Sequence, residues 1–419
     1  MTLRAILCLL FLACPCSVLL AEGERGDWSI PATDDGLPGG GPLRRADWFR
    51  ELWQQKRRGW AERVEADQGA VVFLGDSITQ GWGDDMGGVF GGLKVANRGI
   101  SGDTTRGLLV RLPEDVLALK PAAVVILAGT NDLEERAEPP VIAENVRLIL
   151  DALRAARADL PVVLCKVFPS SASKSRSADQ IQAVNALYAG LVKDRPHVTL
   201  VETWKPFADA VGDALPAEFP DLLHPNAAGY AKWGQALRPI LATLGLVETE
   251  PDGWQPDPGF TSLFNGKDLT GWTFKQGPAF DGQTRSSDQR YLAQNGRLVV
   301  TTPSSGSALA QLWTVREFPR DFTLRLQFRA TPDADSGVFL RGPQLQCRDY
   351  LLAGPFKDLK NYRPQEWNTL EVVVTGDRAH CTCNGEVLDA DFQVPATGPI
   401  GLEGDRGQME YRHLQIKEQ

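Results

Sequence analysis

The chain has 419 residues, which is more than one hydrophobic core ordinarily serves, so two domains are expected. Lysine and arginine total 44 against 53 aspartate and glutamate residues, which gives a net charge of -9, and no basic stripe alternates with aromatic residues. This composition is that of globular domains, and it argues against a nucleic-acid partner.

The first 21 residues have the pattern of a secretory signal. Arg4 precedes an apolar run from Ala5 to Leu20, and Ala21 stands before a polar stretch. Because the run is shorter than the roughly 20 apolar residues that span a bilayer, it predicts export to the periplasm or the medium without a transmembrane anchor. Lipidation at Cys14 is the alternative, although the residues around it fit a lipidation box only in part.

From residue 45 to residue 246, after a flexible segment over 22–44, short apolar runs alternate with longer stretches of helical period. "AVVFLG" at 70–75 and "AAVVILAG" at 122–129 are typical of buried parallel strands, and residues 139–160 have apolar side chains at spacings of three and four. Strands separated by helices predict a parallel sheet covered on both faces. We therefore expect an α/β three-layer sandwich in this half.

The second half has a different period. Residues 247–258, "VETEPDGWQPDP", have the proline-rich, acidic composition of a linker. From 259 to 419 apolar and polar residues alternate, as in "FTLRLQFRA" at 322–330, and Asn384-Gly385 marks a hairpin turn. Many short strands with turn signals predict an all-β jelly roll or β-sandwich.

Four cysteines remain beyond the expected signal. Cys165 stands in an apolar run and is expected to be a small buried hydrophobe. We expect Cys381 and Cys383 to point to opposite faces of a strand and to share neither a disulfide nor a zinc ion. One of them could bridge to Cys347 in an oxidising compartment, and the sequence leaves this pairing open. No metal-ligand set is visible along the chain.

Ser77 follows the first apolar strand, in "GDSITQGW". Ligands of open α/β folds bind at the carboxyl ends of the strands, so Ser77 is a candidate nucleophile at the edge of the sheet. The alternative is that Ser77 only caps the next helix.

Two later strand ends supply hydrogen-bond donors. "NRGISGDTT" contains Gly102, which can bring a bare backbone N–H close to a ligand, and "GTND" contains Asn131, whose amide can be aimed at the same place. Each stretch can also be explained as turn chemistry. Because successive strand ends of this fold face one crevice, we expect both residues to lie near Ser77.

His224, in "DLLHPNAAGY", is one of four histidines in the chain. A serine hydroxyl is a poor nucleophile until a base accepts its proton, and His224 is a better candidate for that base than His197, which leads into a strand. Asp221 lies three residues earlier, a spacing that puts both side chains on one side of a turn. Pro225 suits the first position of the helix that follows.

In this order, "GDSITQGW", "NRGISGDTT", "GTND" and "DLLHPNAAGY" resemble the four blocks of the SGNH, or GDSL-like, hydrolases, in particular bacterial proteins akin to the catalytic subunits of platelet-activating-factor acetylhydrolase. The resemblance implies a flavodoxin-like sheet and no cofactor. It implies Ser77 as nucleophile with Asp221 and His224, and an oxyanion hole formed by Gly102, Asn131 and the Ser77 N–H.

Residues 259–419 resemble the 3-keto-disaccharide hydrolase family of concanavalin-like jelly rolls, through "GFTSLFNGKDLTGW", "SGVFLRG" and "GPIGLEG". This resemblance assigns no catalytic residues. Four aromatic residues could stack on sugar rings, with packing in the core as the alternative for each: Trp272, Trp313, Tyr350 and Trp367.

Together these features predict an exported serine esterase that removes acetyl or another short acyl group from a small-molecule or carbohydrate ester, with a second domain that acts on or binds carbohydrate. The carbohydrate part rests on the resemblance of the second domain alone. One alternative makes that domain the main catalyst, cleaving 3-keto-glycosides. Another is a non-catalytic carbohydrate-binding or adhesion protein.

Overall fold

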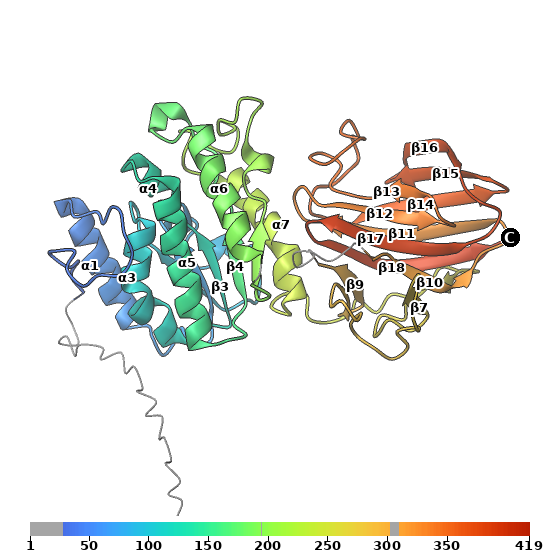
Figure 1. Cartoon of the computed structure of the whole chain (residues 1–419), viewed down its shortest axis with the longest axis horizontal. Helices are drawn as coiled ribbons and strands as arrows, with labels where there is room; N and C mark the ends of the chain where they lie inside the picture. Colours follow the sequence, from blue (N-terminus) through green and yellow to red (C-terminus); the bar gives the residue numbers. More distant parts are fainter. Residues whose placement is uncertain (1–27, 194, 302–309) are drawn as a thin grey trace, which may run out of the picture.

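The computed structural model describes residues 28–193, 195–301 and 310–419. The secretory signal expected over 1–21 lies outside the described residues. Two domains lie side by side along the long axis of the molecule, with the last helix of the first domain at their junction (Figure 1). No helix in the described part of the chain is long and apolar enough to cross a membrane.

The first domain is built on a five-stranded parallel sheet with strand order β2-β1-β3-β4-β5. The strands are β1 (Val71–Gly75), β2 (Val95–Gly99), β3 (Ala123–Leu127), β4 (Val162–Cys165) and β5 (Val198–Val201). The helices are α1 (Asp47–Ala61), α2 (Ser77–Gly81), α3 (Thr105–Asp115), α4 (Thr130–Glu134), α5 (Pro139–Ala156), α6 (Ala178–Val192) and α7 (Ala227–Thr243).

Alternate strand residues enter two separate hydrophobic layers. On one face, Val72 and Leu74 of β1 pack with apolar residues of α3, α5 and α6. On the other face, Val71 and Phe73 pack with α7 and with the segment that follows α2. The predicted α/β three-layer sandwich is confirmed.

Residues 28–44, for which the sequence favours a flexible segment, make specific contacts with α3 and α5. Thr104 Oγ1 donates to the Pro42 carbonyl at 2.7 Å, and the Arg106 guanidinium donates to Asp34 at 2.8 Å. The amide of Asn145 donates to the Gly40 carbonyl at 2.9 Å. This segment and α1 therefore form an outer layer over the first domain (Figure 1).

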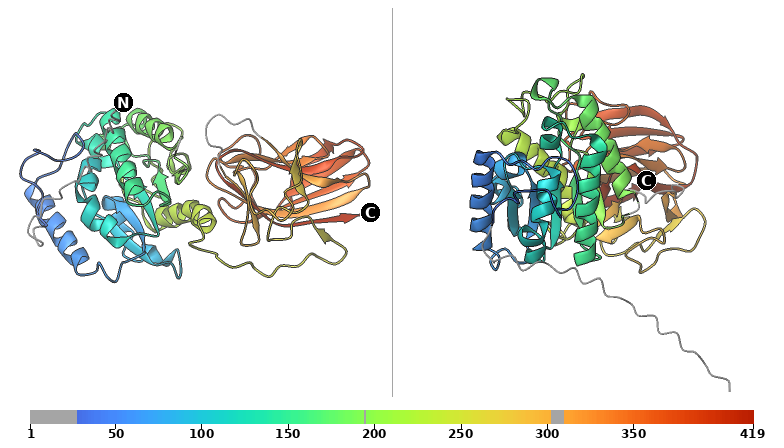
Figure 2. Two further views of the ribbon diagram at one scale, coloured as in Figure 1. Left: turned by 60° about the horizontal axis from the view of Figure 1, so that its bottom comes forward. Right: turned by 60° about the vertical axis from the view of Figure 1, so that its left-hand side comes forward.

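The second domain is the predicted all-β sandwich. One sheet has the order β13-β12-β17-β10-β7, and the other has the order β16-β15-β14-β11-β18-β9-β8, with β6 also paired to β18. Figure 2 shows the two sheets stacked around one core. The strands are β6 (Thr261–Ser262), β7 (Trp272–Phe274), β8 (Tyr291–Gln294), β9 (Arg297–Val300), β10 (Leu312–Glu317), β11 (Phe322–Ala330), β12 (Asp335–Leu340), β13 (Gln344–Gln346), β14 (Asn368–Thr375), β15 (Arg378–Cys383), β16 (Glu386–Gln393), β17 (Pro399–Arg406) and β18 (Met409–Glu418).

The hairpin predicted at Asn384-Gly385 joins β15 to β16. Both residues have positive φ, 48° and 83°, as a two-residue turn of the primed type requires. The cysteine prediction was wrong in one respect: Cys381 and Cys383, two residues apart, share one face of β15, and both are buried. Cys165 and Cys347 are also buried, and none of these four thiols forms a disulfide.

The segment between the domains is anchored by Glu248, which lies within the stretch predicted as a linker. Its carboxylate accepts from both terminal nitrogens of Arg329, at 3.0 and 2.9 Å, and from Arg297 at 2.6 Å. Arg329 also pairs with the fully buried carboxylate of Glu410. The first residues after α7 are therefore fixed to the β domain by charge-assisted hydrogen bonds.

Further contacts join the domains, among them one at α7 and one just after β5. The amide of Gln408 donates to the Pro239 carbonyl in α7 at 3.0 Å. Lys205, just after the carboxyl end of β5, donates to Asp333 at 2.7 Å. The side of the first domain that carries the carboxyl end of β5 thus faces the loop between β11 and β12.

Candidate functional site

Ser77 is the first residue of α2 and follows β1 by two positions. The side chain that caps this helix belongs to Asp76, whose Oδ1 accepts from the Ile78 N–H at 2.9 Å. The Ser77 hydroxyl is not needed as a cap, so it is left to contact another group at the carboxyl end of the sheet.

That other group is His224. Its Nε2 lies 3.0 Å from the Ser77 Oγ, and its Nδ1 lies 2.7 Å from the Asp221 Oδ2. Burial alone would raise the pKa of Asp221, but hydrogen bonds from the backbone N–H and ring of His224 and from the Leu223 N–H hold it at about 2. Because the ionised carboxylate can only accept, Nδ1 carries a hydrogen, and Nε2 of the neutral ring accepts from the serine hydroxyl.

The loop before α7 is shaped by the same carboxylate. Asp221 Oδ1 accepts from the backbone N–H groups of Leu223 and His224, at 3.0 and 2.7 Å, which folds the loop so that the histidine ring turns toward the sheet. The helix begins later than the sequence suggests: Asn226 is its cap and Ala227 its first residue, so Pro225 precedes the cap.

Asn131 lies in α4, at the carboxyl end of β3. Its Nδ2 donates to the Asp103 carbonyl at 2.9 Å, and its Oδ1 accepts from Arg176 at 3.2 Å. A guanidinium can only donate, so Arg176 fixes which end of the amide is oxygen. One of the two hydrogens on Nδ2 remains for a ligand. Arg176 comes from a polar loop after β4, where nothing in the sequence singles it out.

Gly102 has a φ of 85°, a left-handed conformation that favours glycine. A Cβ at this position would lie 2.6 Å from the Trp48 ring and 2.7 Å from Arg44, so a side chain would also displace both. Within the described residues, neither the Gly102 N–H nor the Ser77 N–H has an acceptor. Both donors are therefore free to bind an oxyanion.

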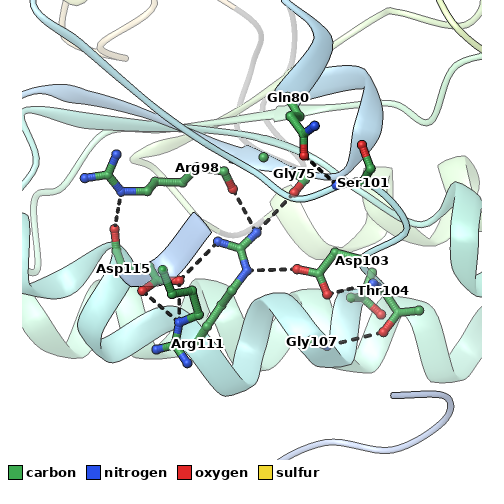
Figure 3. A network of polar contacts seen from close by, with 12 residues as sticks. Gly75, Gln80, Arg98, Ser101, Asp103, Thr104, Gly107, Arg111 and Asp115 are labelled. Atoms are coloured by element: carbon green, nitrogen blue, oxygen red, sulfur yellow. Dashed lines mark hydrogen bonds and ion pairs between the residues drawn. The ribbon is translucent and has the colours of Figure 1, made fainter. Parts of the chain in front are cut away.

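Arg111 connects the ends of β1 and β2 with the turn that follows Gly102 (Figure 3). The side chain is fully buried; its Nε donates to Asp103 Oδ2 at 2.8 Å, and its Nη2 donates to the carbonyls of Gly75 and Arg98, at 3.1 and 2.8 Å. Gly75 ends β1 before Asp76, Arg98 lies in β2, and Asp103 follows Gly102. One guanidinium thus fixes the distance between the blocks that contain Ser77 and Gly102. Because Asn131 donates to the Asp103 carbonyl, its position also depends on this contact.

The sequence matches known families over both domains. Residues 73–232 match the GDSL-like Lipase/Acylhydrolase family, and residues 259–417 match a 3-keto-alpha-glucoside-1,2-lyase-like domain. An acetylxylan esterase of Geobacillus stearothermophilus is 30% identical over 152 residues, which are 33% of this chain and 68% of that protein. The chain belongs to the GDSL-like acylhydrolase family.

Two other similar proteins have a lower sequence identity to this GDSL-like acylhydrolase. The alpha2 subunit of human platelet-activating factor acetylhydrolase IB is 24% identical over 240 residues, which are 56% of this chain and 97% of that protein. The crystal structure of a GDSL-like lipase from Bacteroides thetaiotaomicron is 26% identical and covers 45% of this chain and 97% of its own, with a TM-score of 0.41. With the family established, the protein is a hydrolase of ester bonds.

An exposed aromatic residue stands beside the acylhydrolase site. Trp48, in the first turn of α1, is 52% exposed, and the Arg44 guanidinium lies 5.7 Å from its ring centre. Arg44 also donates to Glu134 and Glu135 at the end of α4, both at 2.8 Å. Glu134 accepts from Arg176 as well. Arg176, which contacts Asn131, and Arg44, which lies near Gly102, are therefore connected through Glu134 in one hydrogen-bond network. Trp48 precedes the recognisable sequence blocks, so no motif could have pointed to it.

Three buried carboxyl groups lie behind the acylhydrolase site. Burial raises the pKa of Asp76 to about 7, and the nearby Asp103 and Asp132 carboxyls add to this effect. Burial likewise raises the pKa of Asp103 and of Asp132 to about 6, against hydrogen bonds and charges that lower it. Asp76 Oδ2 has no hydrogen-bond partner among the described residues, which is consistent with a carboxyl that holds a proton.

Asp76→Asn should become more stable relative to the wild type as the pH rises. The folded-state pKa of Asp76, about 7, lies above the ordinary value of 3.8. The stability that this carboxyl contributes to the folded state is therefore full below pH 3.8 and is lost as the pH rises through 7. Asparagine keeps the cap to Ile78 and does not ionise. Thermal unfolding of both proteins at pH 5 and pH 8 measures the difference.

The matched control is Asp85→Asn, which changes an exposed carboxylate that makes the same kind of cap to the Gly87 N–H at 3.0 Å. If the midpoint of Asp76→Asn differed from that of the wild type by the same amount at both pH values, Asp76 would not carry a raised pKa.

Proposed function

We propose that the protein is a serine esterase that removes acetyl groups from a carbohydrate, with Ser77 as nucleophile, His224 as general base and Asp221 as the residue that orients the base. The observation that carries the proposal is the chain of contacts from Asp221 to His224 to the Ser77 hydroxyl, at 2.7 and 3.0 Å. This is the geometry in which a neutral imidazole can accept the serine proton.

The reaction follows from these groups. The Ser77 Oγ attacks the ester carbonyl as His224 Nε2 takes its proton, and the oxygen that becomes negative accepts hydrogen bonds from the N–H groups of Ser77 and Gly102 and from the Asn131 amide. The protonated His224 then gives its proton to the leaving alcohol. Water, activated by the same ring, releases the acyl group from Ser77.

Two observations favour a carbohydrate alcohol over a lipid. Trp48 exposes about half of its surface beside Gly102, one of the proposed oxyanion donors, and such a ring can stack on a sugar. A relative that is 30% identical over 152 residues is an acetylxylan esterase. Because the name of this relative refers to acetyl esters, we propose a short acyl group.

The second domain is proposed to act on, or bind, the same carbohydrate. Its match to a 3-keto-alpha-glucoside-1,2-lyase-like domain also favours a second candidate, in which this domain cleaves 3-keto-glycosides and the esterase trims substituents. Assaying the full chain with Ser77→Ala on 3-keto-glycosides separates the two. We also propose that the protein is exported, on the apolar run that follows Arg4.

Ser77→Ala should abolish hydrolysis of p-nitrophenyl acetate and of acetylated xylooligosaccharides, because loss of the nucleophile can cost on the order of 10⁶-fold in turnover. The thermal midpoint should stay close to that of the wild type. Ser101→Ala, which removes a hydroxyl beside Gly102, is the control and should keep most of the activity. More than a tenth of wild-type turnover in Ser77→Ala would remove Ser77 from the mechanism.

Asn131→Ala should lower kcat by about 10²- to 10³-fold with a smaller change in KM, as expected for a donor that meets charge only in the transition state. Asn185→Ala is a matched control, since it removes an equally buried amide that bonds only to the backbone of Val167. Steady-state kinetics of both variants would decide; an effect on KM alone would make Asn131 a residue for substrate binding.

Asp221→Asn should lower kcat/KM by about 10²- to 10³-fold, less than the ~10⁴-fold known for buried triad aspartates, because Asp221 and His224 are nearly half exposed and water can replace part of the bond. With the pKa of Asp221 at about 2, its carboxylate stays ionised from pH 5 to pH 9, so the loss should persist across that range.

The control for this variant is Asp209→Asn, in the same loop region. Asp209 accepts from the backbone N–H groups of Val211 and Asp213, both at 2.9 Å, in the way that Asp221 shapes its own loop, but it contacts no histidine. Equal losses in the two variants would show that Asp221 acts only on loop shape and does not orient His224.

A further inference from the structure

The β domain carries a buried carboxylate that forms no ion pair within the described residues. Glu403 lies on β17, the central strand of the five-stranded sheet, and its side chain points away from the core, since its neighbour Leu402 belongs to the core. It is only 8% exposed. Its two oxygens accept from the amides of Gln311 and Gln344, at 2.7 and 2.9 Å, and no Lys, Arg or His among the described residues pairs with it. The burial of this charged group is therefore not compensated by an ion pair within the described residues.

Two glycines make room for the side chains around Glu403. Gly337 and Gly401 have no positive φ, so the backbone does not require glycine at either position. A Cβ at Gly337 would overlap the Gln344 amide, and a Cβ at Gly401 would lie 2.7 Å from the Trp313 ring. Without side chains at these two positions, Gln344 and Trp313 can lie across the neighbouring strands. The two glycines therefore shape the surface around Glu403.

Aromatic rings complete this surface. Trp313 and Phe339 lie on the same face as Glu403, with ring centres 5.1 Å apart and planes at 55°, and both are partly exposed. Trp272 and Tyr350, by contrast, are fully buried in the core, as the packing alternative for them predicts. We call the set of Glu403, Gln311, Gln344, Trp313 and Phe339 the Glu403 platform.

We propose that the Glu403 platform binds a neutral sugar chain. Adjacent hydroxyls of a sugar can donate to the carboxylate and exchange hydrogen bonds with the two amides, each of which has a donor and an acceptor to spare. The C–H faces of the ring can pack on Trp313 and Phe339. A uronic acid would meet the charge of Glu403 and be disfavoured. The assignment rests on the carbohydrate substrate proposed above.

The platform lies close to the junction with the esterase domain. Gly337, which pairs with Glu403, is four residues along the chain from Asp333, and Asp333 contacts Lys205 at the carboxyl end of β5. At the rise of a strand, four residues span roughly 13 Å. A chain bound on the platform thus starts near the end of the esterase sheet at which Ser77 lies.

The test is calorimetric titration of the full chain carrying Ser77→Ala, which cannot deacylate, with xylohexaose, cellohexaose and maltohexaose. At least one should bind, and Trp313→Ala and Glu403→Gln should each weaken that binding by at least about tenfold, the effect of losing one stacked ring or one charged hydrogen bond. Glu371→Gln is the control: this glutamate lies on the outer face of the other sheet, where it contacts Arg325.

The proposal is overturned if none of the three hexasaccharides binds, or if folded Trp313→Ala and Glu403→Gln bind as well as the parent protein. In the chain that keeps Ser77, both substitutions should leave hydrolysis of p-nitrophenyl acetate unchanged. If that chain bound a hexasaccharide but had no esterase activity, the proposed function would be refuted and the sugar-binding role of the platform would stand. If it hydrolysed esters but bound no hexasaccharide, the platform proposal would be refuted and the proposed function would stand.

Discussion

The site depends on one buried guanidinium. Arg111 has no solvent exposure, and it joins the ends of β1 and β2 to the turn after Gly102 through hydrogen bonds to two backbone carbonyls and a hydrogen-bonded ion pair with Asp103. A buried charge that lost its partners would be strongly destabilising, so these groups cannot move apart independently. Through the Asp103 carbonyl the restraint reaches Asn131. The proposed oxyanion donors are therefore held by the interior of the domain and not by its surface loops.

Hydrophobic period and strand-end chemistry predicted much of this structure. The two domain types followed from the change of period near residue 259, and the expected positions of Ser77, Asp221 and His224 bring them into contact because each lies at a strand end or just before a helix. What escaped prediction depends on tertiary contact. Arg176 and Trp48 lie far in sequence from the groups that they support, and nothing in their own neighbours marks them. The same holds for Glu403, whose partners come from β13 and from the segment before β10.

The stretch predicted as a linker shows how composition can mislead. Its prolines and acids are typical of an extended, solvated connection, yet Glu248 is held by Arg329 and Arg297 of the β domain. Together with the contact of Gln408 with the Pro239 carbonyl of α7 and that of Lys205 with Asp333, it fixes the esterase domain against the β-sandwich. A catalytic domain held in this way would meet the proposed carbohydrate in one orientation relative to the β domain, whereas a flexible tether would allow many.

The place of β18 in the second sheet affects the order in which the chain can fold. This strand, Met409–Glu418, follows every other described strand in the sequence, yet it pairs with β11 on one side and β9 on the other, and it supplies Glu410 to Arg329. The β-sandwich therefore cannot close until β18 has been synthesised. The esterase domain has all its strands and helices once α7 has been made, and domains generally fold as units from the amino terminus. During synthesis, the hydrolase domain would fold first, and the sandwich would assemble beside an already folded neighbour.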